Sequence, residues 1–236
     1  MTPRLTAAAL ALALLATPAW AADAVTDAMQ AAYVPYRAAL FKTNAKAQAD
    51  SEQTVADARA QFRALGERYA DKPPAPYDRD PEFAATLKKV DQVLAQADAQ
   101  IKARNLAQGH ETLEAVRDLL GELRRRNGVV VFSDHMNAYH EQMEHVFKDG
   151  AATLAKPGGM LALAGQAAVL DYLAKRLKNE APAALAKDAE FASLVDAVQT
   201  SVNALRAAIA RQDEAAAREA IGKIKSPYSR LFIKFG

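Results

Sequence analysis

Apolar residues recur along most of the chain at alternating steps of four and three positions. Steps of this kind put side chains on one face of an α-helix, so they predict amphipathic helices that pack together. The clearest run covers residues 83–101, and the Asp80-Pro81 pair before it is expected to supply an N-cap and a proline for the first helical position. Runs with the same steps cover residues 55–69 and 106–123.

Together with an amphipathic segment around residues 29–41, these runs predict four helices between residues 24 and 127. Pro35 interrupts the first segment, and we expect it to kink that helix or to set its true start. The stretch Lys72-Pro73-Pro74-Ala75-Pro76 is predicted to be a linker, because consecutive prolines remove backbone donors and keep the chain extended. Residues 124–128, three arginines followed by Asn and Gly, are typical of a helix C-terminus.

The second half of the chain repeats this scheme at an offset of 108 residues. In both halves a helix is predicted to start at an Asp-x-Glu-Phe-Ala sequence, which begins at Asp80 and at Asp188. The helices predicted for the second half cover roughly residues 134–154, 160–179, 188–211 and 213–226. Pro227 is expected to end the last of them, and the apolar tail of residues 231–235 is expected to pack back on the bundle.

A repeat of this length is too long for a solenoid unit and suits a small helical bundle. The sequence therefore predicts an all-α protein made of two tandem antiparallel four-helix-bundle units that arose by internal duplication. The first unit is assigned to residues 22–128 and the second to residues 129–236.

The first 21 residues have the pattern of a secretory signal peptide. A positive start ending at Arg4 precedes an apolar run over residues 7–16, and Ala19-Trp20-Ala21 supplies a small-x-small cleavage site. The run is shorter than the roughly 20 residues that a membrane helix needs. We expect cleavage near Ala21, export to the periplasm and no membrane insertion of the mature chain.

Composition excludes several classes of function. The chain of 236 residues has 30 basic and 28 acidic residues, and this near balance argues against a nucleic-acid partner. It has no cysteine, which excludes disulfides, thiolate metal sites and covalent haem attachment. No glycine-rich phosphate loop, nucleophile elbow or Ser/His/Asp set is present in the sequence, so we do not expect an enzyme.

Exported, alanine-rich bundles of this repeat length resemble the periplasmic four-helix-bundle cytochromes of the b-type and c-prime kind. The stretch from Ala207 to Leu231, with a helix restart at Asp213, is similar to their final two helices. This resemblance implies haem held by a histidine near the end of the last helix. Residues 226–230 and 123–127, which occupy that place here, contain neither histidine nor cysteine, so we expect the fold without the haem.

The histidines are the candidates for chemistry. The chain has four, and two of them open the same pattern, His110-Glu111-x-x-Glu114 and His140-Glu141-x-x-Glu144. Residues four apart share a helix face, so each His/Glu pair can chelate an ion. Each His/Glu pair lies beside the apolar stripe of its helix, and the angular positions of the two pairs around their helices match. This predicts one transition-metal site with four ligands and two reserve donors. The ligands are His110, Glu114, His140 and Glu144, and the reserves are Glu111 and Met143.

The register between the two pairs decides whether they meet. A tight hairpin centred near Val130 would place His140 opposite Gly121, about 16 Å along the axis from His110. A connection that folds back over residues 128–133 would instead bring His140 to the level of His110. The sequence is compatible with both registers. The remaining histidines, His135 and His145, are expected at the surface.

The favoured hypothesis is a non-catalytic, exported protein that binds a transition-metal ion. Histidine and carboxylate ligands suit zinc, iron, manganese or cupric copper, and the residues do not choose among them. Met136 and Met143 are expected to be core residues, although a thioether near the histidines would favour copper.

The alternative is a helical protein-interaction module with no metal, which docks a periplasmic partner through the apolar connection at residues 129–132 or through the C-terminal tail. Arg117 and Arg124 to Arg126 also offer an anion site, but the stabilisation of cations near a helix C-terminus accounts for them more simply.

Overall fold

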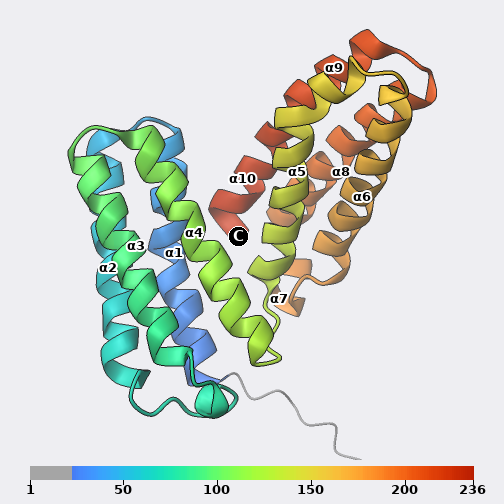
Figure 1. Ribbon diagram of the computed structural model, residues 1–236. Helices are drawn as coiled ribbons and strands as arrows, with labels where there is room; N and C mark the ends of the chain where they lie inside the picture. The colour runs from blue at the N-terminus through green and yellow to red at the C-terminus, as the bar shows by residue number, and fades with distance from the viewer. Residues whose placement is uncertain (1–22) are drawn as a thin grey trace, which may run out of the picture.

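The computed structural model describes residues 23–236, and over this range the chain is helical with no strand, which confirms the all-α class (Figure 1). The predicted signal peptide lies outside the described residues. A first group of helices packs in chain order, and its first member also packs against its last. This group comprises α1 (Ala24–Asn44), α2 (Gln48–Tyr69), the short 3-10 helix η1 (Tyr77–Arg79), α3 (Phe83–Lys102) and α4 (Leu106–Arg126).

A second group follows in the same manner. In it α5 packs against α6 and α9, α6 against α8, and α8 against α9 and α10. This group comprises α5 (Phe132–Leu154), α6 (Gly159–Asn179), the short α7 (Ala183–Ala186), α8 (Ala189–Ala210), α9 (Glu214–Lys223) and α10 (Lys225–Phe235). Among residues 23–236, no helix is long and apolar enough to cross a membrane.

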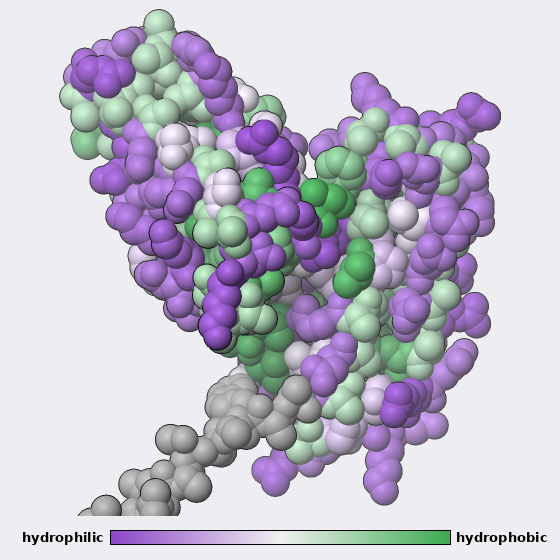
Figure 2. Space-filling view, turned by 180° about the vertical axis from the view of Figure 1, so that it is seen from behind, coloured by the Kyte–Doolittle hydropathy of each residue, from purple (hydrophilic) through white to green (hydrophobic). Residues whose placement is uncertain are grey.

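The two groups diverge like the arms of a V from the connection between α4 and α5, and α10 contacts both α1 and α5 between them (Figure 1). Figure 2 shows the hollow between the groups from behind, with hydrophobic side chains gathered along it and hydrophilic ones on the outer faces. The buried apolar side chains of both groups form one continuous cluster. The two arms are therefore packed together through a shared core.

Short polar side chains begin several of the helices. Asp23 accepts a hydrogen bond from the Thr26 amide at 2.7 Å, and Asp188 and Asp213 cap α8 and α9 in the same way. Asp80 differs from its predicted role, since α3 begins three residues later, at Phe83. One oxygen of Asp80 accepts from the Glu82 amide, and the other pairs with Arg126 at 3.0 Å and so ties the start of α3 to the end of α4.

The prolines behave differently from expectation. Helix α1 continues through Pro35, which therefore does not set its start. The prediction that Pro227 ends the last helix is wrong, because the break lies at Ile224 and Pro227 is in the first turn of α10. A proline there loses no intrahelical hydrogen bond, since the first amides of a helix have no partner within it. The tail does pack back as predicted: Leu231 and Phe232 are buried.

Candidate metal site between the two helix groups

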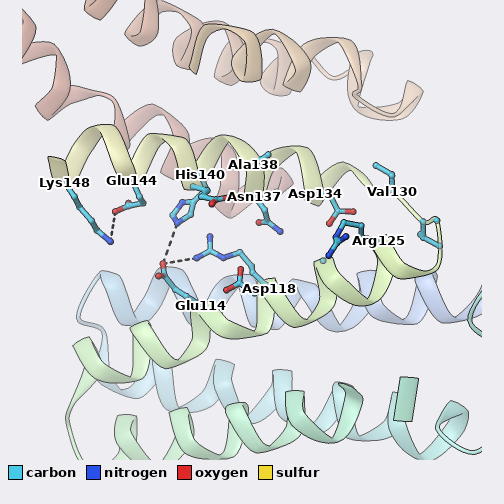
Figure 3. Close-up of a pocket in the computed structure, with 15 residues that line it drawn as sticks. Glu114, Asp118, Arg125, Val130, Asp134, Asn137, Ala138, His140, Glu144 and Lys148 are labelled. Atoms are coloured by element: carbon cyan, nitrogen blue, oxygen red, sulfur yellow. Dashed lines mark hydrogen bonds and ion pairs between the residues drawn. The ribbon is translucent and has the colours of Figure 1, made fainter. Parts of the chain in front are cut away.

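Three of the four predicted ligands lie together where α4 faces α5. His110 and Glu114 are one turn apart on α4, and His140 projects from α5 toward Glu114 (Figure 3). The Nε2 atom of His110 lies 3.7 Å from Oε1 of Glu114, and the Nε2 atom of His140 lies 3.6 Å from the same oxygen. All three side chains line one small cavity of about 50 Å³.

The connection between α4 and α5 determines this register. Gly128 adopts φ +67°, which an L side chain tolerates poorly, and Val131 is extended. Asp134, in the first turn of α5, accepts a hydrogen bond from the Val131 amide and pairs with Arg124 of α4. His140 consequently faces Glu114, which is seven residues nearer to His110 than the Gly121 position of a tight hairpin.

Two buried tyrosines support the site from the neighbouring helices. Tyr36 of α1 donates a hydrogen bond to the carbonyl oxygen of Leu113 at 2.7 Å, directly before Glu114. Tyr228 of α10 donates to the carbonyl oxygen of Met136 at 3.0 Å, one turn before His140. Helices α4 and α5, which carry the candidate ligands, are thus held by hydrogen bonds from α1 and α10.

The protonation state of His110 follows from its partner on α1. Nδ1 of His110 lies 2.9 Å from the hydroxyl oxygen of Thr43, and that hydroxyl is within 2.8 Å of the carbonyl oxygen of Ala39. A hydroxyl that donates to this carbonyl accepts the Nδ1 proton of His110 and leaves the lone pair of the neutral ring on Nε2. Burial lowers the pKa of His110, against the opposing charge of Glu114. In this tautomer, Nε2 presents a lone pair toward the carboxylate near neutral pH.

His140 is also uncharged near neutral pH, because burial lowers its pKa and the contact with the Glu114 carboxylate only partly offsets this. Its side chain is 18% exposed. The other ring nitrogen, Nδ1, is buried and has no hydrogen-bond partner among the described residues. The ring lies beside that of Tyr228, with 5.5 Å between the ring centroids.

Glu114 is ionised and already forms an ion pair with a cationic side chain. Burial raises its pKa, but the neighbouring His140 and the charge of Arg117 outweigh burial and lower the pKa to about 2. An Nη2 atom of Arg117 lies 2.8 Å from Oε1 of Glu114, and the Arg117 side chain is only 7% exposed. The buried guanidinium therefore shares the carboxylate oxygen that the two imidazoles face.

The fourth predicted ligand has other partners. The two oxygens of Glu144 lie 2.8 Å from Nζ of Lys225 and 3.4 Å from Nζ of Lys148, and Figure 3 shows its side chain directed toward Lys148. Glu111, one of the reserve donors, is exposed on α4, whereas Met143 is fully buried and lines the same cavity as the histidines. Among residues 23–236, no three His, Asp or Glu side chains are arranged as a ready metal cluster.

The other histidines lie away from the cavity. His145 is half exposed and pairs with Asp149 on the outside of α5 at 3.1 Å, as expected for a surface residue. His135 is partly buried near the start of α5.

The arginines at the end of α4 form ion pairs in the structure. Arg124 is buried against Asp134, Arg125 pairs with Glu122, and Arg126 pairs with Asp80. Each has a carboxylate partner of its own.

Two residues of the site were missed from the sequence, and a third, Arg117, was considered only as part of an anion site. Arg117 stands three positions after Glu114, a spacing that signals an ion pair on a helix. Thr43 and Lys225 come from α1 and α10, and no local pattern indicates that they approach α4 or α5.

Comparisons with protein-family models, with curated proteins and with solved structures find no match to this chain. Its function is therefore inferred from the residues of the site itself.

Proposed function

We propose that the protein binds one transition-metal ion between α4 and α5, without catalysing a reaction. His110 and His140 are the principal ligands, and Glu114 lies beside them. The observation that carries this proposal is that Nε2 atoms from two helix groups face one carboxylate oxygen at 3.7 and 3.6 Å. Ligand atoms about 2.1 Å from a tetrahedral metal are about 3.4 Å apart, so each histidine nitrogen already stands near this spacing from the Glu114 oxygen.

A cation also resolves an unfavourable contact in the metal-free site. The lone pair of His110 Nε2 is directed toward an anionic oxygen, and the lowered pKa of His110 disfavours the proton that would otherwise lie between them. A metal ion at this point attracts both groups. Thr43 then acts as the partner that metal-binding histidines commonly have on the second ring nitrogen.

Metal binding is tested by adding Zn(II) or copper to protein purified without an affinity tag, in competition with a chromophoric chelator. The double variant His110→Ala/His140→Ala should lose the bound ion. The double variant His135→Ala/His145→Ala removes the same number of histidines away from the cavity and should retain it. Equal metal binding by the two double variants would contradict the proposal.

Export belongs to the same proposal. The support is the charged, apolar and small-x-small pattern of residues 1–21, which is typical of a signal peptide. Mass spectrometry of the protein secreted by a bacterial host should show a chain that begins at Ala22. An intact N-terminus in the cytoplasmic fraction would contradict it.

The second candidate function is docking of a partner protein in the groove between α4 and α5. This groove has a volume of about 670 Å³, and Val130 at its closed end is 64% exposed. Asp118 and Glu141 face it from opposite walls without an ion-pair partner among the described residues, which favours a basic segment. Charge reversal at both acids, Asp118→Lys and Glu141→Lys, should abolish capture of such a segment and leave metal binding unchanged. Capture that survives charge reversal would contradict this candidate.

We also propose that the two helix groups arose by duplication. In both, the Asp of the Asp-x-Glu-Phe-Ala sequence accepts a hydrogen bond from the amide two residues later, at 2.9 Å for Asp80 and 2.8 Å for Asp188. Arg117 and Lys225 stand at the same offset of 108 residues, and each pairs with a carboxylate of the site. An experimental structure should superpose residues 24–126 on 132–235 helix by helix, and a different helix order in the two would contradict common origin.

A further inference from the structure

The charges around the cavity cancel in pairs. Glu114 has Arg117 at 2.8 Å, and Glu144 has Lys225 at 2.8 Å. Lys225 also lines the cavity that contains His110 and His140. Lys148 lies 3.4 Å from Glu144 as a third cation, so the site has no excess negative charge, and a divalent ion would add two uncompensated positive charges to a half-buried space.

The same pairing removes the carboxylates as free ligands. An oxygen that accepts from a buried guanidinium at 2.8 Å donates less readily to a metal, and the donors that remain are the two imidazoles. Met143 supplies a third. It is fully buried, stands three residues after His140 on the same face of α5, and lines the same cavity.

Two imidazole nitrogens and one thioether sulfur form a soft, neutral donor set. Thioether ligands select Cu(I) among the biological metals, whereas zinc and iron bind more strongly where carboxylate or thiolate donors are free. A monovalent ion also adds half the charge of a divalent one to a cavity whose walls include Leu40, Phe41 and Phe232. Building on the proposed function, we propose that this site selects cuprous copper, with Met143 as the third ligand beside His110 and His140.

The test compares Cu(I) and Zn(II) affinities of the full mature chain. Cu(I) is supplied under anaerobic conditions from its complex with a chromophoric chelator, and Zn(II) from a zinc chelator. The wild-type protein should bind one Cu(I) more tightly than Zn(II). The Met143→Leu variant should lose about tenfold or more in Cu(I) affinity and change by less than about twofold for Zn(II).

Met136→Leu is the matched control, because Met136 is equally buried on α5 but does not line the cavity. It should keep the wild-type Cu(I) affinity, and circular dichroism should show the same helicity for both methionine variants. Zn(II) binding as tight as Cu(I), or an unchanged Cu(I) affinity in Met143→Leu, would overturn the cuprous assignment while leaving a metal site at the histidines. Failure of the wild type to bind either ion would overturn the proposed function itself.

Discussion

At the residue scale, the hydrogen bond between Thr43 and His110 sets which ring nitrogen is free. Thr43 is 2% exposed, and removal of its hydroxyl takes away the hydrogen-bond partner of Nδ1 in His110. The imidazole then has no fixed orientation and loses the preference for the tautomer that ligates through Nε2.

We therefore expect the Thr43→Val variant to bind metal about tenfold more weakly while remaining folded. Chelator competition measures the affinity. Thr54→Val on the exposed face of α2 removes a comparable hydroxyl, which bonds to the carbonyl oxygen of Asp50, and should leave affinity unchanged. Equal affinities for the two variants would show that Thr43 has no role at the site.

A second residue-scale prediction concerns pH. Burial lowers the pKa of His110 and His140 below 6.5 in the folded protein. As pH falls through 6.5, the unfolded chain takes up these protons before the folded chain does, so the free energy of unfolding decreases until the folded pKa is passed. The lowered pKa of Glu114 adds a separate loss as pH falls from 4.5 toward about 2.

Melting temperatures of the metal-free protein between pH 8 and pH 5 should thus decline on acidification. The His110→Gln/His140→Gln variant should decline less, because its side chains do not titrate in this range. Parallel declines in the two proteins would show that the histidines are not buried in their neutral form.

At the element scale, the register of α5 against α4 depends on one buried ion pair. The Arg124 side chain is 1% exposed and its partner Asp134 is in the first turn of α5. Removal of the carboxylate leaves a buried guanidinium without its counter-charge, which is strongly destabilising.

The Asp134→Ala variant should lose about 3 kcal/mol in the free energy of unfolding, measured by urea denaturation. Asp149→Ala breaks the exposed pair with His145 on the same helix and should cost less than about 1 kcal/mol. Similar losses in the two variants would mean that the pair at the α4–α5 connection does not hold the register.

Helix positions were more predictable than helix registers. The apolar steps over residues 83–101 and the caps at Asp188 and Asp213 are local features, and the helices there begin and end close to the expected places. The role of Pro227 was not predictable from the sequence. A proline is compatible both with the end of one helix and with the first turn of the next, and the backbone conformation determines which of the two occurs. The level of His140 depended on the backbone at Gly128 and on the distant pairing of Asp134, neither of which a periodic pattern encodes.

At the scale of the whole molecule, the shared core links the two helix groups. Helix α10 packs against α1, and Arg37 of α1 bonds to the carbonyl oxygen of Gly236 at the end of α10. His140 and Glu114 connect the groups a second time. The sequence predicted two sets of helices. It did not predict the contact of α10 with α1, because the two helices are far apart in the chain and neither has a local pattern that indicates the other.

We expect the two groups to unfold together. Urea denaturation followed by circular dichroism at 222 nm and by tyrosine fluorescence should give one transition with coincident midpoints, because the buried cluster is continuous. Two separated transitions would show that the groups are independent domains that merely touch.

The binding of a metal ion between the two helix groups can be tested by anomalous diffraction from crystals grown with bound copper. One strong anomalous peak is expected within about 2.1 Å of Nε2 in both His110 and His140. A peak confined to surface histidines such as His145, or no peak in the cavity, would contradict it.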